Sequence, residues 1–160
     1  MLVAALMERR IRAYFDACNA ADYHAICGHF VPQGAVHYFP PGMYQGPFVG
    51  AETIAERWVK AVGELGSVWT VDQVVTDPSG ARAIVEWSHF KTFTRTLLRG
   101  DEWYVFDRDT GLIREIRAYY ASPHDSNVVA NQLQGFDYQA RGYPLRPPFY
   151  RDAGPSSGDA

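Results

Sequence analysis

The stretch Trp103-Tyr-Val-Phe-Asp-Arg-Asp-Thr-Gly-Leu-Ile-Arg-Glu-Ile-Arg-Ala-Tyr119 carries the strongest structural signal in this 160-residue chain. Aromatic and branched residues alternate with polar ones on both sides of Asp109-Thr110-Gly111, a pattern typical of two antiparallel strands joined by a turn. We predict strands over 96–107 and 112–121, with a β-bulge at Gly100.

The same period of two continues toward the N-terminus. It predicts strands over 68–76 and 82–92, joined by the turn signal Asp77-Pro78-Ser79-Gly80. Together with the first pair, these strands form a four-stranded antiparallel meander. A further short strand is expected over 35–39, before Pro40-Pro41-Gly42 and a glycine-rich loop.

Helical periodicity dominates the first part of the chain. Apolar residues recur every three or four positions over 2–19, and Asp22 is a suitable N-cap for a second helix through Phe30. A third amphipathic helix is predicted over 51–65. A run of helices followed by a run of strands indicates an α+β fold.

Composition restricts the functional classes. Apolar residues make up 47%, charged residues 21% and aromatic residues 14%, and the net charge is -3. Without a concentrated basic patch we expect no nucleic-acid partner, and without a long apolar segment no membrane span. The two cysteines, Cys18 and Cys27, imply no disulfide framework and suit a cytoplasmic location.

The chain divides into three predicted parts. Residues 1–121 form the α+β domain, and residues 122–152 form an irregular extension rich in proline and aromatic residues. Residues 153–160 are expected to be disordered. We expect Tyr138, Tyr143, Phe149 and Tyr150 in the extension to cover either the mouth of a cavity or a neighbouring subunit.

Three stretches carry a family resemblance. They are Ile11 to Asp22 followed by His29-Phe30 and Ala35 to Tyr38, then Gly50 to Ile54, and the hairpin Trp103 to Tyr119. Together they resemble the nuclear transport factor 2-like superfamily, and within it the SnoaL-like polyketide cyclases and the ketosteroid isomerases. The resemblance spans about residues 8 to 121. It implies a cone-shaped fold in which three N-terminal helices pack on a curved, mostly antiparallel sheet and enclose a deep apolar pocket.

The resemblance also assigns two catalytic candidates. Tyr14 stands where ketosteroid isomerases place an oxyanion-hole tyrosine, and Glu102 where related enzymes hold a carboxylic acid in the pocket. Each has a plainer interpretation: Tyr14 as a core residue with a satisfied hydroxyl, Glu102 as an exposed charge in a solvated turn. Glu86 is the alternative carboxylate if the opposite face of its strand points inward.

The position of the general base departs from the family. Tyr38 stands where ketosteroid isomerases carry an aspartate, and a tyrosine with an ordinary pKa near 10 is a poor base. His37 is the candidate to replace it, because imidazole suits proton transfer at neutral pH. Alternation along the strand lets only one of the two face the pocket, and His37 could instead face solvent or a partner subunit.

The remaining candidates are expected to line the pocket as substrate-binding residues: Trp58, Trp87, His89, Tyr104 and Phe106. His89 could alternatively be a satisfied core residue. No metal-binding or nucleotide-binding motif occurs, so we expect no metal and no cofactor. The aspartate that the superfamily's epoxide hydrolases carry in the last strand is replaced by Ala118.

These expectations combine into a functional hypothesis. The protein is a cofactor-independent isomerase, cyclase or dehydratase of secondary metabolism, which transfers a proton next to a carbonyl of an apolar small molecule such as a polyketide, terpenoid or steroid. It is expected to form a homodimer, as relatives do. The alternative is a non-catalytic module of the same fold for small-molecule binding or dimerisation.

Overall fold

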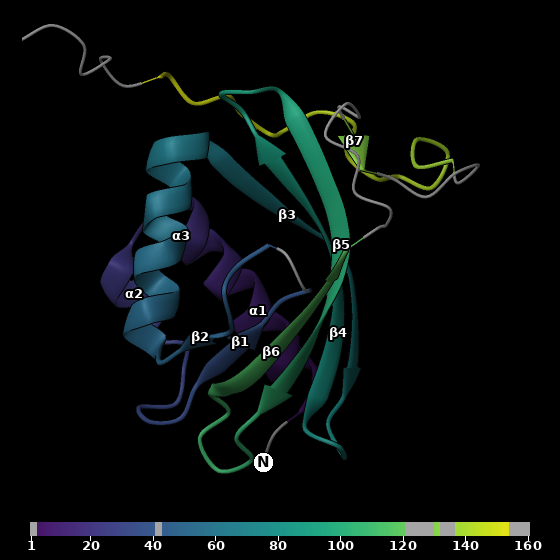
Figure 1. Cartoon of the computed structure of the whole chain (residues 1–160). Helices are drawn as coiled ribbons and strands as arrows, with labels where there is room; N and C mark the ends of the chain where they lie inside the picture. The colour runs from purple at the N-terminus through teal and green to yellow at the C-terminus, as the bar shows by residue number, and fades with distance from the viewer. Residues whose placement is uncertain (1–2, 41–42, 121–129, 132–136, 154–160) are drawn as a thin grey trace, which may run out of the picture.

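Three helices pack on one side of a strongly curved sheet (Figure 1). The computed structural model describes residues 3–40, 43–120, 130–131 and 137–153. The helices are α1 (Ala4–Asn19), α2 (Tyr23–Cys27) and α3 (Ala51–Leu65). The strands are β1 (Val36–Tyr38), β2 (Phe48–Val49), β3 (Ser67–Asp77), β4 (Arg82–Lys91), β5 (Thr96–Phe106), β6 (Ile113–Tyr120) and β7 (Ala130–Asn131). The predicted α+β class and the cone-shaped arrangement are confirmed.

The helix ends follow local chemistry. The Asp22 side chain accepts a 3.0 Å hydrogen bond from the Ala25 amide, so it caps α2 as predicted. This helix ends at Cys27, earlier than the predicted Phe30, because Gly28 closes it. α3 has the predicted bounds, and Gly66 ends it with a φ of 62°.

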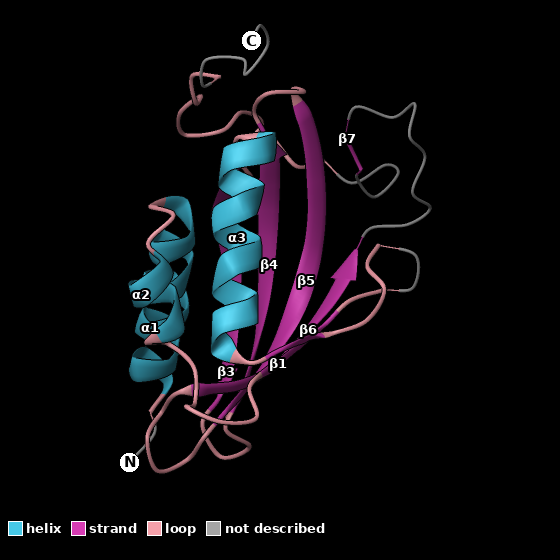
Figure 2. Cartoon of the chain, turned by 60° about the vertical axis from the view of Figure 1, so that its left-hand side comes forward, coloured by secondary structure: helices cyan, strands magenta, loops and turns pink. Residues whose placement is uncertain are grey.

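The sheet has the order β2-β1-β6-β5-β4-β3, and β7 pairs with β5 outside this path. All neighbours on the main path are antiparallel except β1 and β6, and β7 runs parallel to β5. The predicted four-stranded meander is therefore present as β3 to β6, with α3 crossing its inner face (Figure 2). β2 was not predicted, because two residues carry too little pattern to distinguish a strand from a loop.

Gly100 does not form the predicted bulge. It pairs in regular register with Trp87 on β4 and Tyr120 on β6. A Cβ atom at this position would lie 2.8 Å from the Trp87 ring and 2.3 Å from the Tyr119 carbonyl oxygen. The glycine therefore makes room for the indole of Trp87 rather than bending the strand.

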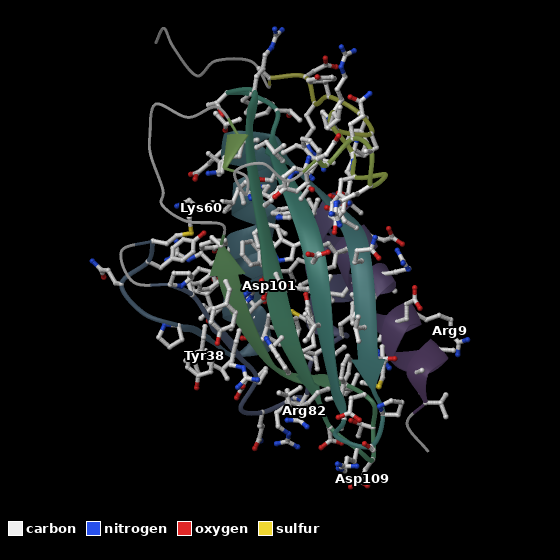
Figure 3. All side chains as sticks on the ribbon, turned by 90° about the vertical axis from the view of Figure 1, so that its right-hand side faces the viewer. Arg9, Tyr38, Lys60, Arg82, Asp101 and Asp109 are labelled. Carbon is white, nitrogen blue, oxygen red and sulfur yellow. The ribbon has the colours of Figure 1, made fainter. Side chains whose placement is uncertain are left out.

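The extension packs partly on the outer face of the sheet, which Figure 3 views directly. There the Arg99 guanidinium lies 4.3 Å from the ring centroid of Tyr138 and donates a 2.6 Å hydrogen bond to the Pro144 carbonyl. These contacts lie on the side of the sheet opposite the helices, so Tyr138 does not cover a cavity mouth. Phe149 and Tyr150 are exposed. The predicted disordered tail, apart from Ala153, lies outside the described residues.

None of the described helices has the length and apolar character needed to cross a bilayer.

Candidate active site

A cavity of about 670 Å³, which includes its opening to solvent, lies between the helices and the inner face of the sheet. Its walls come from α1, α3, β1, the loop that follows β1, and β3 to β6. The lining residues are Tyr14, Phe15, Cys18, His37, Phe39, Met43, Tyr44, Trp58, Ala61, Leu65, Trp69, Trp87, His89, Lys91, Leu98, Glu102 and Tyr120. The wall is thus mainly aromatic, with a few polar groups, as is usual for small-molecule sites.

Glu102 is the acidic residue of this wall, and its side chain is buried on the inner face of β5. The Tyr104 hydroxyl donates a 2.6 Å hydrogen bond to Glu102 Oε2. His37 Nε2 lies 3.3 Å from Glu102 Oε1. The solvated-turn interpretation of Glu102 is therefore wrong, because the alternation of β5 turns this side chain away from water.

His37, rather than Tyr38, faces the cavity. Its side chain is 1% exposed and stacks on the Phe39 ring, with 4.1 Å between the ring centroids. Tyr38 is 44% exposed on the opposite face of β1 and does not line the cavity. The imidazole therefore sits among aromatic rings, where its contact with Glu102 is shielded from water.

Tyr14 reaches the cavity from α1. Its hydroxyl oxygen accepts a 2.7 Å hydrogen bond from the Trp58 indole nitrogen on α3. Burial holds the pKa of Tyr14 well above its ordinary value, and the neighbouring Cys18 and Glu102 add to this effect. The phenol therefore keeps its proton at neutral pH and can donate it in a hydrogen bond. On α1 it interacts with the Cys18 thiol one turn along the helix, which is a weak acceptor.

Tyr104 and Phe106 do not line the cavity, although both are buried on the inner face of β5. They lie behind its wall, with stacked rings whose centroids are 6.4 Å apart. Burial, followed by the charge of Glu102, raises the pKa of Tyr104 well above its ordinary value, so this phenol remains a hydrogen-bond donor. Tyr104 thus supports Glu102 instead of contacting a ligand.

His89 and Trp87 both lie on the cavity wall, as predicted for pocket residues. His89 Nε2 is 2.8 Å from the Ser67 hydroxyl, and its ring stacks on Trp69. Burial, with a smaller contribution from the charge of Lys91, lowers the pKa of His89 to about 3, so the ring is neutral at physiological pH. The Trp87 indole nitrogen is buried and has no hydrogen-bond partner in the part of the chain that the structure describes.

The other carboxylate candidate lies elsewhere. Glu86 is exposed on the outer face of β4, where the Tyr143 hydroxyl donates a hydrogen bond to it. Ala118 is buried on β6 directly opposite Glu102, so the position of the epoxide-hydrolase aspartate adjoins this carboxylate. Over the described residues, no group of three or more His, Cys, Asp or Glu side chains is placed to hold a metal ion.

Several cavity residues were not predicted. Met43 and Tyr44 come from the loop between β1 and β2, where no periodicity marks an inward side chain. Trp69 stands on β3, beside His89 on β4. Lys91 was detectable in principle, because it continues the two-residue alternation of Trp87 and His89 along β4.

Comparison with solved structures agrees with this architecture. A protein of unknown function with a cystatin-like fold from Methylobium petroleophilum PM1 is 51% identical, with a TM-score of 0.75, and the alignment covers 94% of this chain and 99% of that chain. This coverage includes most of the extension. A search of curated proteins finds no match.

More distant structures share the fold. The epoxide hydrolase/cyclase-like enzyme SalBIII, of pyran ring formation in polyether salinomycin, is 18% identical, with a TM-score of 0.61 and coverage of 75% of this chain and 94% of that chain. An LEH-like epoxide hydrolase of M. tuberculosis is also 18% identical, with a TM-score of 0.59 and coverage of 72% and 83%.

The family model of the SnoaL-like domain matches residues 11–116, which run from within α1 to within β6 and include the cavity residues Tyr14, His37 and Glu102. The match covers well over half of the chain. The chain therefore belongs to the SnoaL-like domain family.

Proposed function

We propose that this protein is a cofactor-independent isomerase, cyclase or dehydratase that moves a proton next to a carbonyl of an apolar small molecule. One observation carries the proposal: the buried Glu102 carboxylate faces a solvent-open aromatic cavity, with His37 Nε2 at 3.3 Å and the Tyr104 hydroxyl at 2.6 Å. A carboxylate and an imidazole in contact within an apolar cavity are suited to general acid-base catalysis.

The proposed step divides the chemistry between two sides of the cavity. Glu102, assisted by His37, takes a proton from the carbon next to the carbonyl, and the C–H electron pair moves to the carbonyl oxygen to form an enolate. The Tyr14 hydroxyl donates a hydrogen bond to this enolate oxygen. The Tyr14 oxygen itself accepts a hydrogen bond from Trp58, so the phenolic proton can point toward the substrate. Returning the proton to another carbon gives isomerisation. Return of the proton from Glu102 to a β-hydroxyl, which then leaves as water while the enolate electrons form the C=C bond, gives dehydration.

The wall of the cavity supports an apolar substrate. Aromatic side chains from Phe39, Trp58, Trp69 and Trp87 surround the polar groups, so a polyketide, terpenoid or steroid skeleton fits the chemistry. SalBIII, which shares the fold, acts in pyran ring formation in a polyether. This agrees with a role of the present chain in secondary metabolism.

The test is exchange of the α-proton, which does not require the final product to be known. Apolar ketones are incubated in D₂O with the protein, and loss of the α-proton signal is followed by NMR. We expect Glu102→Gln to slow exchange by about 100-fold or more and Tyr14→Phe by at least about tenfold. Glu56→Gln and Tyr119→Phe, at partly or fully exposed positions, serve as matched controls. If neither cavity variant slows exchange tenfold, the assignment is wrong.

The alternative is a non-catalytic binding module. It is favoured by the internal hydrogen bonds of the site. The Trp58 indole already donates to the Tyr14 oxygen, and the Tyr104 hydroxyl already donates to Glu102 Oε2. If the protein is a binding module, an added ketone is expected to quench the tryptophan fluorescence, because Trp58, Trp69 and Trp87 line the cavity. The α-proton of the ketone would then remain unexchanged.

We further propose that the outer face of the sheet pairs with a second copy to form a homodimer. Val75 and Tyr119 are 67% and 51% exposed on the strands that form this face, and Trp103 lines a shallow hollow beside Val75. The extension covers only part of this face, and exposed apolar side chains on the rest of a sheet are stabilised when another surface covers them. Light scattering of the intact chain, with Trp103→Arg as the disrupting variant, tests this.

We also propose a cytoplasmic location, because the free thiols of Cys18 and Cys27 suit a reducing compartment.

A further inference from the structure

Lys91 introduces a positive charge into the wall of an otherwise apolar region of the cavity. It is one of only two lysines in the chain, the other being Lys60. Val85, Trp87, His89 and Lys91 alternate along β4, so Lys91 continues the row of side chains on the inner face. It lines the cavity at the end of β4, near the β4–β5 turn at the top of Figure 1.

The Lys91 ammonium group has no carboxylate partner within the part of the chain that the structure describes. Among the described residues none of the ion pairs includes Lys91, whereas Lys60 pairs with Glu64 at 3.6 Å. The side chain is only partly exposed. Its neighbour His89 is neutral and bonded to Ser67, so it adds no second charge to this region of the wall. As far as the described residues line it, the cavity thus presents one cation without an ion-pair partner.

The acidic group of the cavity lies well away from this cation. Glu102 pairs with Val85 in the sheet, and Lys91 pairs with Thr96. Lys91 lies six positions after Val85 on β4, which corresponds to roughly 20 Å along an extended strand. Trp87 and Leu98 occupy the wall between them. The cavity is therefore polarised, with a carboxylate at one end and an ammonium at the other.

We infer that the cavity binds an elongated apolar ligand that carries an anionic group, most simply a carboxylate, and that Lys91 pairs with this group. Glu102 repels an anion from its own end, so the two charges select a single orientation. The reactive carbonyl then points toward Glu102 and His37; this part of the inference rests on the proposed function. The ion pair with Lys91 does not depend on catalysis. Lys91 is thus a specificity-determining residue.

The test uses two chains of equal length that differ in charge, decanoate and 1-decanol. Binding to the intact protein is followed by tryptophan fluorescence, because three indoles line the cavity. We expect the wild type to prefer decanoate, and Lys91→Gln to raise its Kd by about three- to tenfold while the Kd of decanol stays within about twofold. Lys91→Arg retains the preference, and Lys60→Gln, which removes the only other lysine, has no effect.

A second readout identifies the residue directly. Reductive ¹³C-methylation of the wild type yields two lysine signals, and Lys60→Gln assigns them. Addition of decanoate, but not of decanol, is expected to shift the Lys91 signal alone.

Equal effects of Lys91→Gln on both probes would overturn the inference, and so would failure of both probes to bind or an unmoved Lys91 signal. A wild-type protein that exchanges α-protons but does not prefer decanoate to decanol would overturn only this inference. A preserved preference without exchange would overturn only the proposed catalysis.

Discussion

The Tyr104 hydroxyl holds Glu102 from two residues farther along the same strand, through a 2.6 Å hydrogen bond to Oε2. Both side chains lie on the inner face of β5, since alternation places residues two apart on one side. Tyr104 is fully buried and closes the space behind the carboxylate. The remaining oxygen, Oε1, is the one that lies near His37.

Removing this hydroxyl is expected to impair the carboxylate without removing it. Tyr104→Phe leaves the ring packing intact but deletes one hydrogen bond to a charged group, so we expect α-proton exchange to slow by about tenfold. The loss is expected in kcat rather than in KM, because Tyr104 lies behind the cavity wall and does not contact the ligand. A variant that unfolds more readily but keeps the wild-type kcat would limit Tyr104 to a structural role.

Gly100 tests the packing behind the cavity. A Cβ atom there would approach the Trp87 ring to 2.8 Å, and the backbone leaves no room on the other side. We expect Gly100→Ala to lower the free energy of unfolding by about 2 kcal/mol or more, as overpacked substitutions do. Gly63→Ala in α3 is the control, since nothing lies within 4 Å of its added carbon, and it should be neutral or stabilising. Urea unfolding measures both, and equal behaviour of the two variants would contradict the packing argument.

The buried His89 predicts a loss of stability in acid. Burial lowers its pKa to about 3 in the native state, whereas the unfolded chain binds a proton near pH 6.5. The stabilisation is therefore complete above about pH 6.5 and is lost as the pH falls toward 3, by about 2 kcal/mol between pH 7 and 5. His29, whose pKa burial also lowers, contributes in the same direction.

Urea unfolding of His89→Gln at pH 7, 6 and 5 checks this prediction. Its stability should fall less with acid than that of the wild type, because a glutamine does not titrate. His24→Gln, at an exposed position of α2, should keep the wild-type dependence. Identical slopes for wild type and His89→Gln would refute the assignment.

The outer face of the sheet contains a buried ion pair between β3 and β5, and its arginine also donates a hydrogen bond to Pro144 of the extension. Arg99 Nη1 lies 3.7 Å from Asp72 Oδ2, with side chains 4% and 3% exposed. Arg99→Gln leaves the Asp72 carboxylate buried without its cationic partner, and it is expected to lower the free energy of unfolding by about 3 kcal/mol. Arg114→Gln breaks the exposed pair with Asp107 and should cost less than about 1 kcal/mol. Comparable losses in thermal unfolding would mean that burial of the Arg99 pair has no energetic effect.

Local pattern was sufficient for most of the architecture. The bounds of α3 and the four strands of the meander follow from periods of 3.6 and 2, and Asp22 marks its helix through its capping side chain. The two predictions about the sheet that were missing or wrong also have local causes. β2 is too short for a pattern, and Gly100 resembles a bulge in sequence although its role is to accept the Trp87 ring.

Alternation along the sequence determines that His37 and Tyr38, or Glu86 and Trp87, face opposite sides of the sheet. It does not determine which side is covered, because the covering helices and the β1–β2 loop come from distant parts of the chain. Only the tertiary structure buries Glu102 and His37 together, leaves Tyr38 in water, and sets Lys91 apart from Glu102 in one cavity. The physical reason is that burial, and with it the strength of every charge in the site, depends on contacts between elements far apart in sequence.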